Sequence, residues 1–312
     1  DDDQDRVVQE AKSLNQDPFA LARFFEKAFL EDLERLNIQR ADHYPRASET
    51  IEEMIKICSI LQKNGFAYVG KDGSLFFDAK KSIDYGVISG NKLAELHPGH
   101  RFGGESDSSK NFHADWALWK LAPNRSEMVW ESPWGVGFPG WHIECAAIAL
   151  KFAEAESDYV IDIQGGGKDL IFPHHEMSAS QVKLLTGKTF ARAYVHAALI
   201  GLDGEKMSKS KGNLVFVSKL IEAGVSPMAI RWALLKRPYS QEYMWLRNET
   251  DIAQTELDAL KVKLGRDSVP ATDNLIKAIY DFLADDLKSA DAIAAINNWV
   301  GTDGHGGDAN QL

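Results

Sequence analysis

Residues 159–185 read YVIDIQGGGKDLIFPHHEMSASQVKLL, and this stretch decides the fold class. The apolar run Tyr159–Ile163 has the composition of a strand, and it leads directly into three glycines. Pro173 then opens a helix-like segment, and a second strand-like run follows at Ala193–Ile200. Strand, glycine loop, helix and strand in this order predict an α/β protein with a Rossmann-like, doubly wound parallel sheet.

The glycine loop is followed by a lysine and an aspartate, giving Gly165-Gly166-Gly167-Lys168-Asp169. Glycines at the carboxyl end of a parallel strand let a nucleotide approach the backbone closely, and the Asp169 carboxylate can accept hydrogen bonds from ribose hydroxyls. Three glycines alone are also typical of a flexible turn. Their position after a strand is what favours nucleotide binding.

A lysine-rich loop follows the Asp203-Gly204 turn and reads Lys206-Met207-Ser208-Lys209-Ser210. Closely spaced ammonium groups and hydroxyl donors can surround a polyphosphate and tighten as negative charge builds on a leaving pyrophosphate. A solvated basic turn is the alternative, but the full string after a strand and a turn favours phosphate binding. Lys206 and Lys209 are therefore predicted to stabilise the departing pyrophosphate.

A possible metal site involves Cys145 and His174. Trp141 and Cys145 are spaced to share one helix face, as are His174 and Ser178 on the next predicted helix. A thiolate and an imidazole are good zinc ligands, although catalytic zinc normally has three protein ligands. Spacing alone leaves core packing of Cys145 and helix capping by the histidines as alternatives.

The rest of the chain suggests several further regions. Helices are expected over residues 18–36 and 50–65 and a hairpin over 66–78, whereas residues 79–112 are polar and glycine-rich without clear periodicity. The expected regions are 1–66, the helical remainder of a first Rossmann half; 67–135, an inserted connective subdomain; 136–200, a second Rossmann half carrying the zinc and adenylate site; 201–245, the lysine loop and a helical segment; 246–300, a C-terminal helical bundle; and 301–312, a disordered tail.

Composition excludes several classes of protein. The 312 residues carry a formal net charge of −11, which disfavours a broad basic surface for nucleic acid or anionic membrane. No apolar run approaches the length of a membrane span and no secretion signal opens the chain. Two cysteines, Cys58 and Cys145, exclude a disulfide scaffold and suit a reducing cytoplasm. We expect a cytoplasmic monomer without membrane association.

Together these strings resemble the cysteinyl-tRNA synthetase family, within the class I aminoacyl-tRNA synthetases, over nearly the whole chain. The matching strings are GWHIEC at residues 140–145, DIQGGGKDLIFPHHE at 162–176 and KMSKS at 206–210. The resemblance implies a class I catalytic domain whose first half is largely missing here, with an inserted subdomain and a C-terminal helical bundle. It also implies ATP, with Mg²⁺, as a substrate.

The resemblance assigns roles residue by residue. It makes Cys145 and His174 zinc ligands, with a further Cys ligand expected upstream of this chain. It places Trp141 in the cysteine pocket, and Ile200 where a backbone contact to adenine is expected. The remaining nucleotide-binding residues that it implies are Gly167, Lys168, Asp169, Lys206, Met207, Ser208, Lys209 and Ser210.

One departure points to a particular branch of the family. The tRNA enzymes usually carry a second Glu, also a zinc ligand, where this chain has Ser178. This difference, together with Gln164 and the strand around His196, resembles the mycothiol-pathway cysteine ligases, a paralogous branch. That branch joins L-cysteine to the amine of glucosaminyl-inositol through a cysteinyl adenylate, without tRNA. His196 itself is expected to be a packed or hydrogen-bonded residue.

Two alternatives remain open at this point. One is a cysteinyl-tRNA synthetase, and the other is a non-catalytic nucleotide- or zinc-binding remnant. The remnant is motivated by the family's His-x-Gly-His-type signature, which is expected upstream of Asp1. The string Arg101–Ser106 is a further departure, because an Arg-Gly-Gly-Asp-Pro-like string is usual there. The sequence does not assign the general base, for which His142 and His175 are weak candidates.

Overall fold

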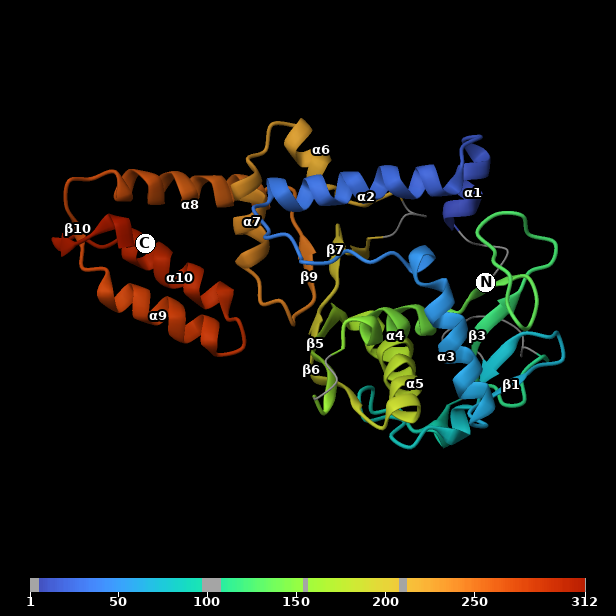
Figure 1. Ribbon diagram of the computed structural model, residues 1–312. Helices are drawn as coiled ribbons and strands as arrows, with labels where there is room; N and C mark the ends of the chain where they lie inside the picture. Colours follow the sequence, from blue (N-terminus) through green and yellow to red (C-terminus); the bar gives the residue numbers. More distant parts are fainter. Residues whose placement is uncertain (1–5, 97–107, 154–156, 208–211, 312) are drawn as a thin grey trace. The chain divides into compact units, whose positions relative to one another are not determined.

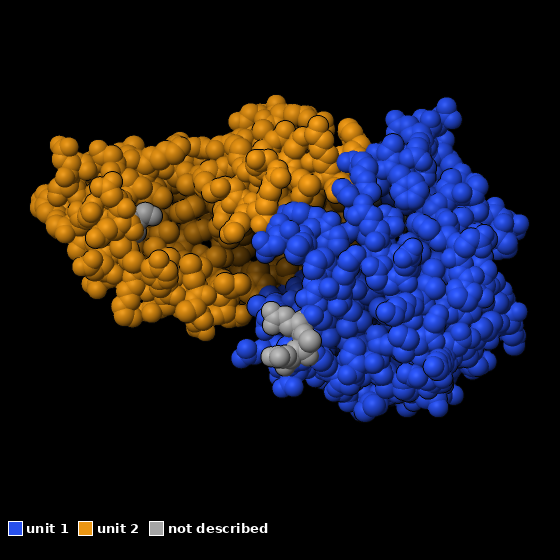
Figure 2. Space-filling view, in the orientation of Figure 1, with its two compact units in different colours: residues 1–23, 41–196 blue, residues 24–40, 197–312 orange. Residues whose placement is uncertain are grey.

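The computed structural model describes residues 6–96, 108–153, 157–207 and 212–311. The chain forms two compact units: residues 1–23 with 41–196, and residues 24–40 with 197–312 (Figure 2).

The first unit contains an antiparallel four-stranded sheet covered by a helix. The expected helix and hairpin are confirmed as α3 (Ile51–Lys63) and the strands β1 (Ala67–Val69) and β2 (Leu75–Phe77). Gly65 lies just after the end of α3 and has a φ of +76°. This left-handed backbone conformation favours glycine. The sheet continues through β3 (Trp116–Leu121) and β4 (Gly137–Pro139).

The core of the first unit joins this sheet to the helices around the candidate site. It includes Leu61 from α3, Phe77 from β2, Trp119 from β3 and Ile143 from α4 (Trp141–Lys151), all essentially inaccessible to solvent. Because α4 shares this apolar core, the residues on its other faces are held in fixed positions.

A second sheet of this unit carries the stretch that decided the fold class. Strand β5 (Tyr159–Gly167) pairs with β6 (Thr189–Ala197), and α5 (Glu176–Thr186) connects them (Figure 1). The Thr189 N–H donates to the Asp158 carbonyl at 3.2 Å, so both strands begin at the same end and run parallel. The α/β fold with a parallel sheet is thus confirmed. A π-helical turn, Ile171–His175, precedes α5 and contains the cis Phe172–Pro173 peptide.

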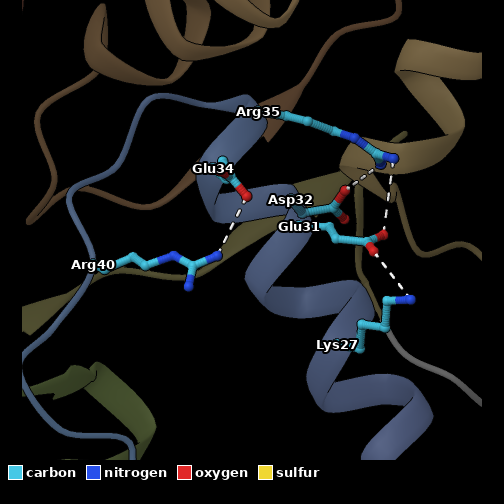
Figure 3. A network of polar contacts seen from close by, with 6 residues as sticks. All are labelled: Lys27, Glu31, Asp32, Glu34, Arg35 and Arg40. Atoms are coloured by element: carbon cyan, nitrogen blue, oxygen red, sulfur yellow. Dashed lines mark hydrogen bonds and ion pairs between the residues drawn. The ribbon is translucent and has the colours of Figure 1, made fainter.

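The second unit begins with the C-terminal part of α2 (Pro18–Arg35), the helix expected over residues 18–36. Exposed ion pairs line this part of α2: Lys27 with Glu31 at 3.8 Å, Arg35 with Asp32 at 3.1 Å and Arg40 with Glu34 at 3.4 Å (Figure 3). Pairs of this kind contribute only about 0.3–0.5 kcal/mol each. Arg231 adds hydrogen bonds to the Leu36 and Asn37 carbonyls at 2.8 and 2.9 Å.

The remainder of the second unit is a small sheet followed by helices. Strand β7 (Ile200–Leu202) lies between β8 (Glu205–Lys206), antiparallel to it, and β9 (Tyr243–Trp245), parallel to it. The helices are α6 (Val217–Glu222), α7 (Pro227–Leu235), α8 (Glu249–Leu264), α9 (Asp273–Ala284) and α10 (Ser289–Val300). One core lies between α7, β9 and α8, and another includes Leu275 of α9 and Trp299 of α10. None of the described helices is long and apolar enough to cross a membrane.

The expected disordered tail is wrong for residues 301–311. Strand β11 (Gly306–Gly307) pairs antiparallel with β10 (Val269–Pro270), and Ala309–Gln311 forms a 3₁₀ turn. A Cβ on Gly307 would lie only 1.9 Å from the Pro270 carbonyl oxygen, so the glycine permits this close pairing. The glycine content that suggested disorder is therefore what allows the strand to pair.

Candidate active site

Four histidines form two imidazole pairs in the first unit. His142, in the first turn of α4, meets His174 of the π-helical turn with 3.0 Å between their Nδ1 atoms. His175 Nδ1 lies 2.8 Å from Nε2 of His196, which is on β6. The expectation that His196 is a hydrogen-bonded residue is confirmed. Segments far apart in the sequence thus bring four imidazole rings together, and each neutral ring can both donate and accept a hydrogen bond.

Burial keeps these rings uncharged. Burial, with His174 and Lys120 nearby, lowers the pKa of His142 to about 3. Burial, with His196 and His174 nearby, lowers the pKa of His175 to about 4. Burial also lowers the pKa of His174 and of His196. Within each pair, one ring N–H therefore donates to an unprotonated nitrogen of the other ring.

The position of His175 depends on its neighbours on β5. The Gln164 side-chain amide donates to His175 Nε2 at 3.2 Å, which leaves the proton on Nδ1 to be donated to His196. A Cβ on Gly166 would lie 2.9 Å from His175 Cε1 and 3.1 Å from Leu170 Cδ1. Gly166 therefore provides the space that the buried His175 ring fills.

The predicted residues of α4 lie at the edge of this cluster. Trp141 is 76% exposed, so its ring is free to form the wall of a ligand site. Cys145 is also exposed, one turn after His142. Desolvation by the surrounding protein and the nearby Glu144 charge raise the pKa of the Cys145 thiol to about 11. Ser178 is buried, and its hydroxyl donates to the His142 carbonyl at 3.2 Å.

The donor set fits zinc only in part. His174 uses Nδ1 to contact His142, and its Nε2 has no hydrogen-bond partner among the described residues, an arrangement typical of metal-ligating histidines. In the described ranges, however, no group of three or more His, Cys, Asp or Glu side chains could hold a metal ion. These residues alone do not complete a zinc site.

The glycine loop has a defined shape at the end of β5. Gly167 ends the strand, and Lys168–Leu170 forms a 3₁₀ turn directly after it. A Cβ on Gly167 would lie 2.5 Å from Asp169 Oδ1, so the Asp169 carboxylate folds back over the glycine. The structure thus brings Gly167 and Asp169 together.

The other predicted nucleotide-binding residues belong to the second unit. Ile200 pairs with Tyr243 across β7 and β9, and Lys206 is an exposed residue of β8. Met207 packs against the core between α7 and α8. The three remaining residues of the predicted loop, Ser208, Lys209 and Ser210, lie outside the described residues.

Sequence reasoning missed Glu176, the first residue of α5. Its side chain is buried, and the carboxylate accepts backbone N–H bonds from Gly86 at 2.9 Å, Ile88 at 3.2 Å and Ser89 at 2.8 Å. Burial, together with the Glu176 charge, raises the pKa of Tyr85 beside these residues. No sequence signal could identify this contact, because the partners are backbone groups almost ninety positions away.

The chain matches one known family over most of its length. Residues 1–257 match the family described as tRNA synthetases class I (C) catalytic domain. The structure also resembles a methionyl-tRNA synthetase of Mycobacterium tuberculosis in complex with methionyl-adenylate, with a TM-score of 0.65 and 19% identity over 95% of this chain and 72% of that one. At that identity the likeness concerns the fold alone.

Curated relatives carry two different names. A Kribbella flavida protein named L-cysteine:1D-myo-inositol 2-amino-2-deoxy-alpha-D-glucopyranoside ligase is 41% identical, covering 91% of this chain and 69% of its own. An Acidothermus cellulolyticus protein of the same name is 38% identical over 99% of this chain and 75% of its own. A Thermococcus onnurineus protein named cysteine–tRNA ligase is 37% identical over 94% of this chain and 63% of its own.

Proposed function

Because the chain belongs to the family of tRNA synthetases class I (C) catalytic domains, we propose that it is an ATP-dependent ligase joining L-cysteine to the amine of glucosaminyl-inositol, in mycothiol synthesis. The observation that carries this proposal is the 41% identity with a relative of that name over 91% of the chain. Ser178 supports it, because its hydroxyl is bound to the His142 carbonyl where the tRNA enzymes are expected to have a carboxylate ligand.

The proposed reaction has two steps. The cysteine carboxylate attacks the α-phosphate of MgATP, which forms cysteinyl adenylate and releases pyrophosphate. The sugar amine then attacks the cysteinyl carbonyl, the carbonyl–phosphate bond breaks, and AMP leaves as the amide forms. Positioning and charge neutralisation supply most of the acceleration in such displacements.

We assign roles in nucleotide binding to the following residues, as the family resemblance implies. In the first unit Gly167, Lys168 and Asp169 would contact the adenylate, and the carboxylate folded over Gly167 supports this role. In the second unit the Ile200 backbone would contact adenine, and Met207 and Ser208 would contact ATP. The charges for the departing pyrophosphate would come from Lys206 and Lys209, with Ser210 as a hydroxyl donor.

We also propose that Cys145 and His174 are two ligands of a zinc ion. The exposed thiol of Cys145 and the Nε2 of His174, which has no hydrogen-bond partner within the described ranges, support this assignment. When bound, zinc would hold the substrate thiolate, and Trp141 would form the wall of that pocket. Metal analysis tests it: Cys145→Ser and His174→Asn should lose zinc relative to His113→Asn, which changes an exposed histidine. Equal zinc in all three variants would refute the ligand assignment.

The second candidate function is that of a cysteinyl-tRNA synthetase. The 37% identity with a cysteine–tRNA ligase over 94% of the chain favours it. The two candidates share the adenylate step and differ only in the attacking group, which is a ribose hydroxyl in tRNA and an amine in the sugar. Action without tRNA, the monomeric state and the cytoplasmic location stay predictions.

A parallel assay separates the candidates. The complete protein is incubated with ATP and cysteine, with glucosaminyl-inositol or with cysteine tRNA, and the cysteinyl product is identified by mass. A cysteinyl amide on the sugar amine with uncharged tRNA is the expected outcome. Cysteinyl-tRNA without a sugar product would refute the ligase proposal and support the cysteinyl-tRNA synthetase. No product from either acceptor with the full-length protein would refute both and leave a binding role.

A further inference from the structure

We propose that Glu176 is a positioning residue for cysteine binding, because its carboxylate fixes the loop Ser82–Gly90 against the turn that carries His174 and His175. This inference rests on the proposed function and deepens it. It adds to the site a residue that binds no substrate atom and acts through the backbone of another segment.

The first observation is the way in which the Glu176 charge is buried. Only 1% of the residue is exposed, and three backbone N–H groups of the loop 82–90 point at its two oxygens. A buried carboxylate is costly unless hydrogen bonds replace its water, and bonds to a charged acceptor are about twice as strong as neutral ones. Glu176 has no Lys or Arg partner among the described residues, so the loop backbone satisfies the charge.

The second observation is that the loop is built to one shape. Gly86 and Gly90 have φ angles of +95° and +74°, which favour glycine. A Cβ on Gly86 would lie 2.3 Å from the Asn91 carbonyl oxygen, so no other residue fits there without movement. The Ser82 hydroxyl donates to the Ser180 hydroxyl at 2.8 Å, which ties the start of the loop to α5.

The third observation joins the loop to the candidate active site. The Tyr85 ring meets Phe172 edge-on, with centroids 6.4 Å apart, and Phe172 lies in the same π-helical turn as His174 and His175. The Tyr85 hydroxyl is buried without a partner among the described residues, so the contact depends on packing. Glu176 directly follows His175, so the residue that holds the loop is covalently part of the turn that the loop supports.

These contacts predict which step depends on Glu176. Without the carboxylate, three loop N–H groups lose their acceptor and the support behind Phe172 is released. A displacement of about 1 Å at a substrate-positioning group can cost about 10²-fold in rate. Because the supported turn carries His174, the proposed zinc ligand, the loss should concern cysteine rather than ATP.

The test compares Glu176→Gln, Glu176→Asp and Ser180→Ala in cysteine-dependent exchange of pyrophosphate into ATP. Glu176→Gln should raise the KM for cysteine about tenfold or more and leave the KM for ATP within about twofold. Glu176→Asp, which keeps the charge, should recover part of the loss. Ser180→Ala removes the other tie between the loop and α5, and it should change the cysteine KM by less than about threefold, since a neutral hydrogen bond contributes little.

Hydrogen exchange gives a readout that does not need catalysis. The amides of Gly86, Ile88 and Ser89 should exchange at least about tenfold faster in Glu176→Gln than in the wild type, since their acceptor is weakened. An unchanged cysteine KM in an active chain, or equal rises in both KM values, would overturn the positioning role. If the wild type shows no cysteine-dependent pyrophosphate exchange, the proposed function is overturned and the cysteine-binding role with it. If only the amide hydrogen exchange is unchanged in Glu176→Gln, the proposal that Glu176 holds the loop 82–90 is overturned.

Discussion

At the scale of single residues, the space beside Gly166 determines where His175 lies. A Cβ at position 166 would approach His175 Cε1 to 2.9 Å and Nε2 to 3.1 Å. His175 is 1% exposed and is held by Gln164 and His196, so it cannot turn aside without breaking hydrogen bonds. We expect Gly166→Ala to lower the free energy of unfolding by about 1–3 kcal/mol, the usual cost of overpacking, as measured by denaturant titration.

The neighbouring glycine provides the matched control for this substitution. No atom lies within 4 Å of the Cβ position of Gly165, although it belongs to the same strand. Gly165→Ala should therefore change the free energy of unfolding by less than about 1 kcal/mol. The added methyl group meets no atom there, so the substitution changes only the conformational entropy that the backbone loses on folding. Equal destabilisation by the two variants would show that the strand, and not His175, resists the added methyl group.

The same two glycines show what the sequence could and could not reveal about the site. Resemblance predicted roles for Cys145, His174 and the glycine loop, because those residues stand in contiguous strings, and these roles stay predictions. Of the three glycines the resemblance assigned only Gly167 to the nucleotide, and it gave no role to Gly166, whose missing side chain makes room for His175. Glu176 was missed for a related reason, since its partners are backbone groups that only the folded chain brings near.

At the scale of helices, Glu256 of α8 joins α8 to the end of α7. Its carboxylate accepts hydrogen bonds from Lys236 Nζ at 2.5 Å and Trp232 Nε1 at 2.7 Å. Burial alone would raise the pKa of Glu256, but hydrogen bonds from Lys236, Trp232 and Asn297 outweigh it and lower the pKa below its ordinary value of 4.5. A carboxyl group with a lowered folded-state pKa stabilises the fold above its unfolded pKa, and this contribution is lost as pH falls through the folded value.

We therefore expect Glu256→Gln to reduce the stability of the second unit near pH 7 by up to about 1 kcal/mol, the range for partly exposed pairs. The difference from the wild type should shrink as pH falls from about 4.5, the ordinary pKa of a glutamate, through the lower folded-state pKa of Glu256. Thermal unfolding across this pH range measures both effects. Glu222→Gln, which changes an exposed pair with Lys219 at 2.7 Å, serves as the control and should show little change at any pH. A constant difference at all pH values would contradict the ionic explanation.

Elements with strong local signals were predictable from the sequence, and the others were not. The helix ended by Gly65 and the hairpin around Lys71-Asp72-Gly73 are confirmed because periodicity and turn residues are local. The expectation of a disordered tail was wrong for residues 301–311. Its pairing partner Val269–Pro270 lies over thirty residues earlier, so composition alone could not show that the glycines fit against a strand.

At the scale of the whole molecule, the units do not follow the order of the chain. Residues 24–40 group with residues 197–312, although the sequence suggested a helical region continuous to residue 66. Arg231 illustrates the reason, because it holds the Leu36 and Asn37 carbonyls across almost 195 positions of sequence. Such a contact leaves no periodic or compositional signal in either segment.

The separate cores predict separate responses to mutation. Leu61 is fully buried in the core of the first unit, and Leu257 is 6% exposed in the core between α7 and α8 of the second unit. Truncation of a buried leucine to alanine costs about 2–5 kcal/mol, and a unit with its own core can unfold by itself. Leu61→Ala should therefore accelerate native-state hydrogen exchange in α3 and β3 and leave α8 unchanged, whereas Leu257→Ala should do the reverse. If either variant accelerated hydrogen exchange equally in α3 and α8, the two units would unfold as one cooperative structure. The stability of the site around His175 would then depend on the core of the second unit as much as on the core of the first.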